Sequence, residues 1–146
     1  LDLYGSNKKN LNRQRERFRY KETIRIHGKL RRKDVVDLMQ TADVLLLIQN
    51  TDDVSFETIP SKVYEYLHTG RPILALLYRN PELQAILEGM GHIVVQADDI
   101  DGITKGLEAY RGGWEKDQLH GSAQESPFTV DRVVDRLISL LKGSIQ

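Results

Sequence analysis

Short apolar runs alternate along this chain with longer segments whose apolar residues recur at helical spacing. We expect strands at residues 1–4, 23–27, 42–48, 72–77 and 92–95. We expect helices at residues 8–19, 31–40, 60–69, 81–89 and 98–110. A last amphipathic helix has its apolar positions at Val130, Val133, Val134, Leu137, Leu140 and Leu141. This alternation predicts an α/β fold, a Rossmann-like doubly wound parallel sheet with helices on both faces.

The aliphatic run at residues 42–48 has the composition of a central parallel strand that is covered on both sides. Ligands of open parallel sheets bind beyond the carboxyl ends of the strands. The loop at residues 49–59 follows this strand, so we expect the binding site there. Residues 112–127, rich in Gly, Ser and charge, are expected to form another loop.

Length and composition limit the class of protein. With 146 residues, 40% of them hydrophobic, the chain can form one domain. It has no cysteine, which excludes disulfides and thiolate chemistry, and its four histidines lack metal-ligand spacing, so we expect no metal. No apolar run has the roughly 20 residues of a membrane-spanning helix. We therefore expect a soluble, cytoplasmic protein.

Charge is unevenly distributed, although the net charge is zero. Residues 1–33 contain 12 Lys and Arg against three Asp and Glu, whereas the other residues contain nine against 18. A basic surface can bind phosphates, nucleic acid or anionic lipid. Nucleic-acid binding would lead us to expect interleaved aromatic residues, and only Phe18 and Tyr20 qualify. We favour a solvated helix and expect no nucleic-acid partner.

The residues best suited to bind a ligand lie at positions 57–65, Glu-Thr-Ile-Pro-Ser-Lys-Val-Tyr-Glu. Pro60 presets the backbone of a first helical turn, and the free N–H groups that follow attract phosphate. Glu65, about one turn further, can accept hydrogen bonds from a vicinal diol. No glycine-rich dinucleotide fingerprint or P-loop occurs in the chain.

A family resemblance extends over about residues 1–146. The segments His27-Gly28-Lys29-Leu30, residues 42–48, residues 57–65 and Gly70-Arg71-Pro72 resemble, in this order, the donor-binding half of a GT-B glycosyltransferase. The similarity is greatest to the family-4 group of retaining enzymes. The resemblance implies transfer of a hexosyl group from a nucleotide diphosphate sugar to an acceptor whose identity the sequence does not encode.

The resemblance also implies a role for each matching residue. Glu57 would be the catalytic residue, near the hexose, and Glu65 would bind the ribose hydroxyls. The diphosphate would meet the segment formed by Thr58, Ile59, Pro60, Ser61 and Lys62. The base would be lined by Gly28, Lys29 and Leu30. In this family positive groups stabilise the leaving diphosphate in place of a metal, so no cofactor is expected.

The chain departs from the family in two respects. We expect residues 1–146 to be a single, incomplete carboxyl-terminal nucleotide-sugar-binding domain, because the amino-terminal acceptor-binding domain and the first strand and helix of the donor domain have no counterpart. That acceptor-binding domain would be the partner that completes the enzyme and that reaches a membrane surface. The 146 residues alone are expected to lack transferase activity.

Two other functions are consistent with the same residues. The first is one lobe of a hydrolysing nucleotide-sugar epimerase, which uses a similar donor pocket. The second is a non-catalytic module that binds a nucleotide or a protein. Binding of uridine or guanosine diphosphate, and its loss in Glu65→Ala, would separate an enzyme donor lobe from a protein-interaction module.

Overall fold

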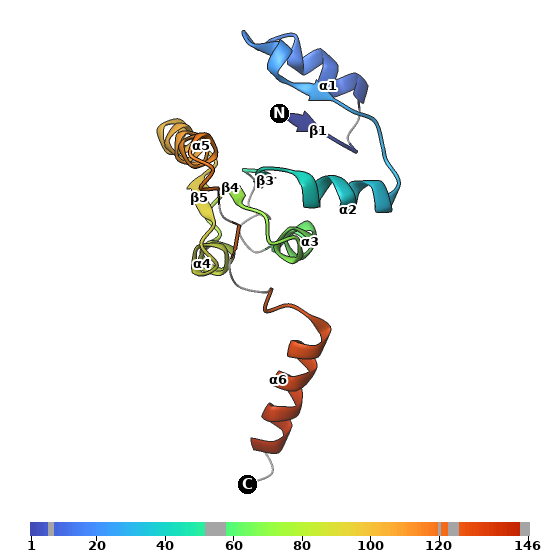
Figure 1. Cartoon of the computed structure of the whole chain (residues 1–146), viewed down its shortest axis with the longest axis vertical. Helices are drawn as coiled ribbons and strands as arrows, with labels where there is room; N and C mark the ends of the chain where they lie inside the picture. The colour runs from blue at the N-terminus through green and yellow to red at the C-terminus, as the bar shows by residue number, and fades with distance from the viewer. Residues whose placement is uncertain (6–7, 52–57, 120, 123–125, 144–146) are drawn as a thin grey trace. The chain divides into compact units, whose positions relative to one another are not determined.

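The computed structural model describes residues 1–5, 8–51, 58–119, 121–122 and 126–143 (Figure 1). The chain divides into two compact units, Leu1–Leu38 and Met39–Gln146.

The first unit contains a small parallel sheet. Its elements are β1 (Asp2–Leu3), α1 (Lys8–Arg15), the short 3-10 helix η1 (Lys21–Thr23) and β2 (Arg25–Ile26). β1 and β2 pair in parallel, with Asp2 opposite Arg25. Gly5 follows β1 with a φ of 81°, a conformation that glycine adopts without steric strain, and its N–H donates to the carbonyl oxygen of Gly28 at 3.2 Å. Helix α2 (Arg32–Thr41) spans the boundary between the units.

A three-stranded parallel sheet forms the core of the second unit. Its elements are β3 (Leu45–Ile48), α3 (Lys62–His68), β4 (Ile73–Leu77), α4 (Pro81–Gly89), β5 (Ile93–Gln96), α5 (Ile100–Glu115) and α6 (Val130–Gly143). The strand order is β3-β4-β5, with Leu45 opposite Ile73 and Leu74 opposite Ile93. In Figure 1, α4 and α5 lie on opposite sides of β5.

Aliphatic side chains of the strands and of two helices form the core of this unit. The largest fully buried side chains are Leu47, Val63, Leu67, Ile73, Leu74, Leu77, Leu83 and Leu87. Burying each contributes about 1.5 to 3 kcal/mol relative to an exposed position. α5 comes especially close to the sheet at Gly106, where a Cβ atom would lie 3.0 Å from Cδ1 of Leu74.

Local sequence explains where α4 and α5 begin. The side chain of Asn80 accepts a hydrogen bond from the Leu83 N–H at 3.0 Å, and Pro81 occupies the first turn of α4. Asp99 caps α5 by accepting from the Gly102 N–H at 2.9 Å. The predicted bounds of α4 are confirmed.

The predicted alternation of parallel strands and helices is confirmed, but the single doubly wound sheet is not. The strands form two small sheets, and a Rossmann-like arrangement is not established. The prediction that residues 42–48 form the central strand is wrong for the sheet described here. β3 lies at the end of this sheet, and the middle strand is β4, whose residues are almost all buried.

Two further differences concern the carboxyl-terminal half. α5 continues through Gly112 and Gly113 to Glu115, although we expected a loop from residue 112. α6 is amphipathic as predicted, but its apolar side chains are exposed, from 42% at Ile138 to 79% at Val130. Among the helices of the described segments, none is long and apolar enough to cross a membrane.

Candidate site at the carboxyl ends of β3 and β4

Two buried amide side chains meet at one backbone carbonyl beyond the carboxyl ends of adjacent strands. Gln49 directly follows β3, and Asn80 follows β4 three residues after its end. The Gln49 Nε2 donates to the carbonyl oxygen of Thr58 at 2.9 Å, and the Asn80 Nδ2 donates to the same oxygen at 3.1 Å. Thr58 therefore lies at the edge of the sheet where parallel α/β proteins bind ligands.

Helix α3 begins just after this carbonyl, through a tight turn. The Val63 N–H donates to the Pro60 carbonyl at 2.9 Å, and the Tyr64 N–H donates to the Ser61 carbonyl at 3.2 Å. These bonds span three residues, so regular α-helix starts at Lys62 and not at the predicted Pro60. Within the described residues, the backbone N–H groups of Ser61 and Lys62 have no acceptor. Unpaired amides of this kind are available to an anion.

The predicted side chains around this turn are accessible. Thr58, Ser61, Lys62 and Glu65 are exposed, whereas Ile59 and Pro60 are half-buried. The Ser61 side chain makes no capping hydrogen bond to the helix. α3 ends at His68, and Gly70 follows it with a φ of 67°, the left-handed conformation common just after helix ends.

Glu65 contributes the negative charge nearest to the middle of α3. Burial raises the pKa of the Tyr66 hydroxyl, and the charge of the adjacent Glu65 raises this pKa further. The carboxylate of Glu65 is on an exposed residue, so a diol could reach it from solvent. Its contact with a ribose stays a prediction.

Four other predicted residues are not brought to this site by the described structure. Glu57 lies outside the described residues. Gly28, Lys29 and Leu30 belong to the first unit, where the Gly28 carbonyl accepts from the Gly5 N–H and the next two residues are exposed. The assignment of Gly28, Lys29 and Leu30 to the base therefore stays a prediction.

In the first unit, directly before Gly28, a cluster of polar side chains joins β1 to β2. The Nε2 of His27 lies 2.8 Å from Oδ1 of Asp2, and the ring of His27 stacks on Tyr4 with centroids 4.3 Å apart. Arg25 forms an ion pair with the same carboxylate at 2.8 Å. The hydrogen bond to His27, followed by that to Arg25, lowers the pKa of Asp2. These side-chain contacts add to the backbone hydrogen bonds that pair the two short strands.

Gln49 and Asn80 belong to this candidate site but were not predicted from the sequence. Asn80 stands directly before Pro81, a pattern typical of a helix N-cap, and this signal could have identified it. The sequence signal for Gln49 is weaker, because it is only a polar residue that directly follows an aliphatic run. The sequence does not indicate that both side chains bind Thr58.

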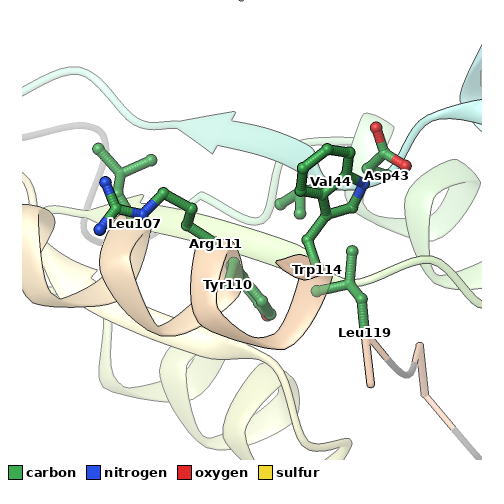
Figure 2. A pocket seen from close by; sticks show the side chains of 7 residues that line it. All are labelled: Asp43, Val44, Leu107, Tyr110, Arg111, Trp114 and Leu119. Atoms are coloured by element: carbon green, nitrogen blue, oxygen red, sulfur yellow. The ribbon is translucent and has the colours of Figure 1, made fainter. Parts of the chain in front are cut away.

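A separate groove lies at the opposite ends of the strands. It has a volume of about 210 Å³ and is lined by Asp43, Val44, Leu107, Tyr110, Arg111, Trp114 and Leu119 (Figure 2). Asp43 and Val44 precede β3, so the groove opens at the amino end of this strand. None of the predicted site residues lines it, and we do not assign the donor to it.

Comparison with known proteins identifies no family for this chain. No protein-family model matches it, and no curated protein has a matching sequence. In the described segments, no three His, Asp or Glu side chains are grouped so that they could hold a metal ion. The structure establishes an α/β arrangement with parallel strands.

Proposed function

We propose that this chain is the donor-binding domain of a retaining glycosyltransferase, which transfers a hexosyl group from a nucleotide diphosphate sugar to an acceptor. The observation that carries this proposal is the position of Thr58, held by side chains that follow two neighbouring parallel strands. The exposed turn from Pro60 to Lys62 continues directly from this point. It is the part of the chain with the strongest family resemblance.

The diphosphate would bind at this turn. The N–H groups of Ser61 and Lys62 would donate to its oxygens, and the Lys62 ammonium group would supply positive charge. α3 has only seven residues, so these local donors contribute more than the dipole of the whole helix. A lysine at the start of a helix is unfavourable without an anion, and a bound phosphate would reverse this cost.

The sugar rings would be bound by the two glutamates of the motif. Glu65 would accept hydrogen bonds from the two ribose hydroxyls, and Glu57 would lie near the hexose as the catalytic residue. Both assignments rest on the resemblance of the motifs.

The chemistry required of this domain is electrostatic. The bond between the anomeric carbon and the leaving phosphate oxygen breaks, the sugar develops oxocarbenium character, and negative charge grows on the diphosphate. Donors that are already oriented toward this charge lower the barrier, because they need no rearrangement during the reaction. A second, acceptor-binding domain would supply the acceptor and close the cleft.

Isothermal titration calorimetry of the 146-residue chain with uridine diphosphate and guanosine diphosphate tests the proposal. We expect one of the two to bind, and Glu65→Gln to weaken it roughly tenfold or more, as for loss of hydrogen bonds to a charged group. Glu82→Gln is the matched control, because Glu82 is an exposed glutamate in the first turn of α4. This control should bind like the wild-type chain.

Two outcomes would contradict the proposal. Binding of neither diphosphate would favour a non-catalytic protein-interaction module. Equal binding by the wild-type chain and Glu65→Gln would remove Glu65 from the site. An epimerase lobe would also bind a nucleotide, and it would be distinguished by interconversion of sugar epimers in the complete enzyme.

A further inference from the structure

The Thr58 carbonyl oxygen accepts a hydrogen bond from each of two side chains that are far apart in the sequence. Gln49 is nine residues before Thr58, and Asn80 is 22 residues after it. Both amides are almost completely buried, with exposed fractions of 5% and 3%. A carbonyl oxygen has two lone pairs, and both are used here.

The orientation of each amide group is fixed by a second hydrogen bond. The Oε1 of Gln49 accepts from the Tyr78 N–H at 3.3 Å, and the Oδ1 of Asn80 accepts from the Leu83 N–H at 3.0 Å. Rotating either amide by 180° would place its NH₂ group against a backbone N–H and its oxygen against the Thr58 carbonyl. Each NH₂ group must therefore point toward Thr58.

Burial makes this arrangement costly to disturb. Movement of Thr58 would break two hydrogen bonds made by buried amide groups, and buried polar groups that lose a hydrogen bond cost free energy. Thr58 is consequently held at a fixed position relative to the ends of β3 and β4. Ile59 and Pro60 follow directly, and the proline ring restricts the backbone as it leads into the first turn of α3.

We infer that Gln49 and Asn80 are positioning residues, which together hold the Thr58 carbonyl and thereby orient the amides at the start of α3. What they position is the diphosphate site, so this role rests on the proposed function. Neither side chain touches the donor. They act through Thr58, on the backbone that would meet the diphosphate.

Two nearly isosteric substitutions separate this role from ordinary packing. Asn80→Asp retains an oxygen for the Leu83 N–H, and Gln49→Glu retains one for the Tyr78 N–H, but each replaces the donor that faces Thr58 by a second oxygen. Asp99→Asn is the control, because it makes the reverse exchange at the N-cap of α5, where Asp99 contacts the Gly102 N–H.

Nuclear magnetic resonance tests the hydrogen bonds without any ligand. We expect each substitution to shift the carbonyl carbon resonance of Thr58 and to speed exchange of the Val63 and Tyr64 amides, which close the first turn of α3, at least threefold. The double variant should add little to either single one, because both donors serve the same oxygen. An unchanged Thr58 resonance and unchanged exchange in both single variants would overturn the inference.

Calorimetry with uridine and guanosine diphosphates tests the functional consequence. We expect Asn80→Asp and Gln49→Glu to bind roughly tenfold more weakly than the wild-type chain, and the Asp99→Asn control to bind within twofold of it. Wild-type affinity in both variants, together with a shifted Thr58 resonance, would overturn the positioning role. If the wild-type chain bound neither diphosphate, the proposed function would fail with it, whereas the resonance measurement would still decide whether the two amides hold Thr58.

Discussion

The hydroxyl of Tyr110, on α5, donates a hydrogen bond of 3.0 Å to the carbonyl oxygen of Ile73, at the start of β4. The same hydroxyl accepts a bond of 3.1 Å from the Ile93 N–H, at the start of β5. One side chain thus satisfies backbone groups of two neighbouring strands. Burial raises the pKa of this hydroxyl, so it stays protonated and able to donate.

Removing this hydroxyl should destabilise the second unit. Tyr110→Phe keeps the ring but leaves the Ile73 carbonyl and the Ile93 N–H unpaired, which we expect to lower the free energy of unfolding by about 1 to 3 kcal/mol. Urea unfolding measures the change. Tyr78→Phe is the control, because no hydrogen bond of its hydroxyl is found in the described part of the chain, and it should change this free energy by less than about 0.5 kcal/mol. Equal effects of the two substitutions would contradict the bridging role of Tyr110.

Replacing either of two α5 glycines by alanine should change the stability of the protein, but in opposite directions. At Gly106 a Cβ would lie 3.0 Å from Leu74 and 3.3 Å from Ile93, so Gly106→Ala crowds the contact between helix and sheet. Crowding of this kind costs about 1 to 3 kcal/mol, more than the helix propensity that alanine adds. At Gly112 a Cβ meets nothing within 4 Å, so Gly112→Ala should raise stability by about 0.5 to 1 kcal/mol. Thermal unfolding of the two variants measures the difference, and a higher stability of Gly106→Ala than of the wild-type chain would contradict a close approach of α5 to the sheet at Gly106.

His92 should make the unfolding free energy depend on pH. It is 6% exposed, its Nε2 has no partner among the described residues, and burial lowers its pKa. The unfolded chain, with an ordinary histidine pKa near 6.5, therefore binds a proton more readily than the folded chain. Stability should be highest above about pH 6.5 and should fall as the pH is lowered from there toward the folded-state pKa.

Urea titrations between pH 5 and 8 measure this dependence. His92→Asn should flatten the curve in this range, whereas His68→Asn, at an exposed position, should keep the wild-type slope. The lowered pKa of Asp2 acts in a more acidic range, because its carboxylate is protonated only below about pH 4. A wild-type slope in His92→Asn would exclude His92 as the source of the pH dependence.

Lys62 should discriminate diphosphates from nucleosides. If its ammonium group contacts phosphate, Lys62→Ala should weaken binding of the preferred nucleoside diphosphate roughly tenfold and leave binding of the corresponding nucleoside unchanged. Calorimetry with the diphosphate and the nucleoside provides the comparison. Lys105→Ala, an exposed position on α5, is the control and should affect neither. Equal weakening of both ligands would place Lys62 away from the phosphates.

The sequence predicted best those elements whose two ends carry local signals. α4 was predicted from Pro81 to Gly89, because proline favours the first turn and glycine the end, and no tertiary contact is needed to place them. The end of α5 was predicted five residues too early, since Gly112 and Gly113 resemble a loop. Tyr110 anchors α5 to β4 and β5 near this point, and this contact depends on residues far away in the chain.

The candidate site was predicted only in part, for a similar reason. The position after β3 follows from the rule for parallel sheets, and the exposed turn at Pro60 and Lys62 follows from local sequence. The hydrogen bonds that hold Thr58 join segments from three parts of the chain, so no local pattern identifies Gln49 as a partner. The position of β3 in the sheet likewise depends on strand pairing, which hydrophobicity alone does not determine.

The place of β3 at the end of its sheet has a practical consequence for handling the protein. The strand, Leu-Leu-Leu-Ile, contains no charge and no proline, the features by which exposed edges usually resist pairing with other molecules. Among the described residues no strand pairs with its outer side, and backbone groups there can serve as a template for a further strand. The amount of protein lost to aggregation should therefore rise faster than linearly with protein concentration. Dilute samples should stay free of aggregates longest.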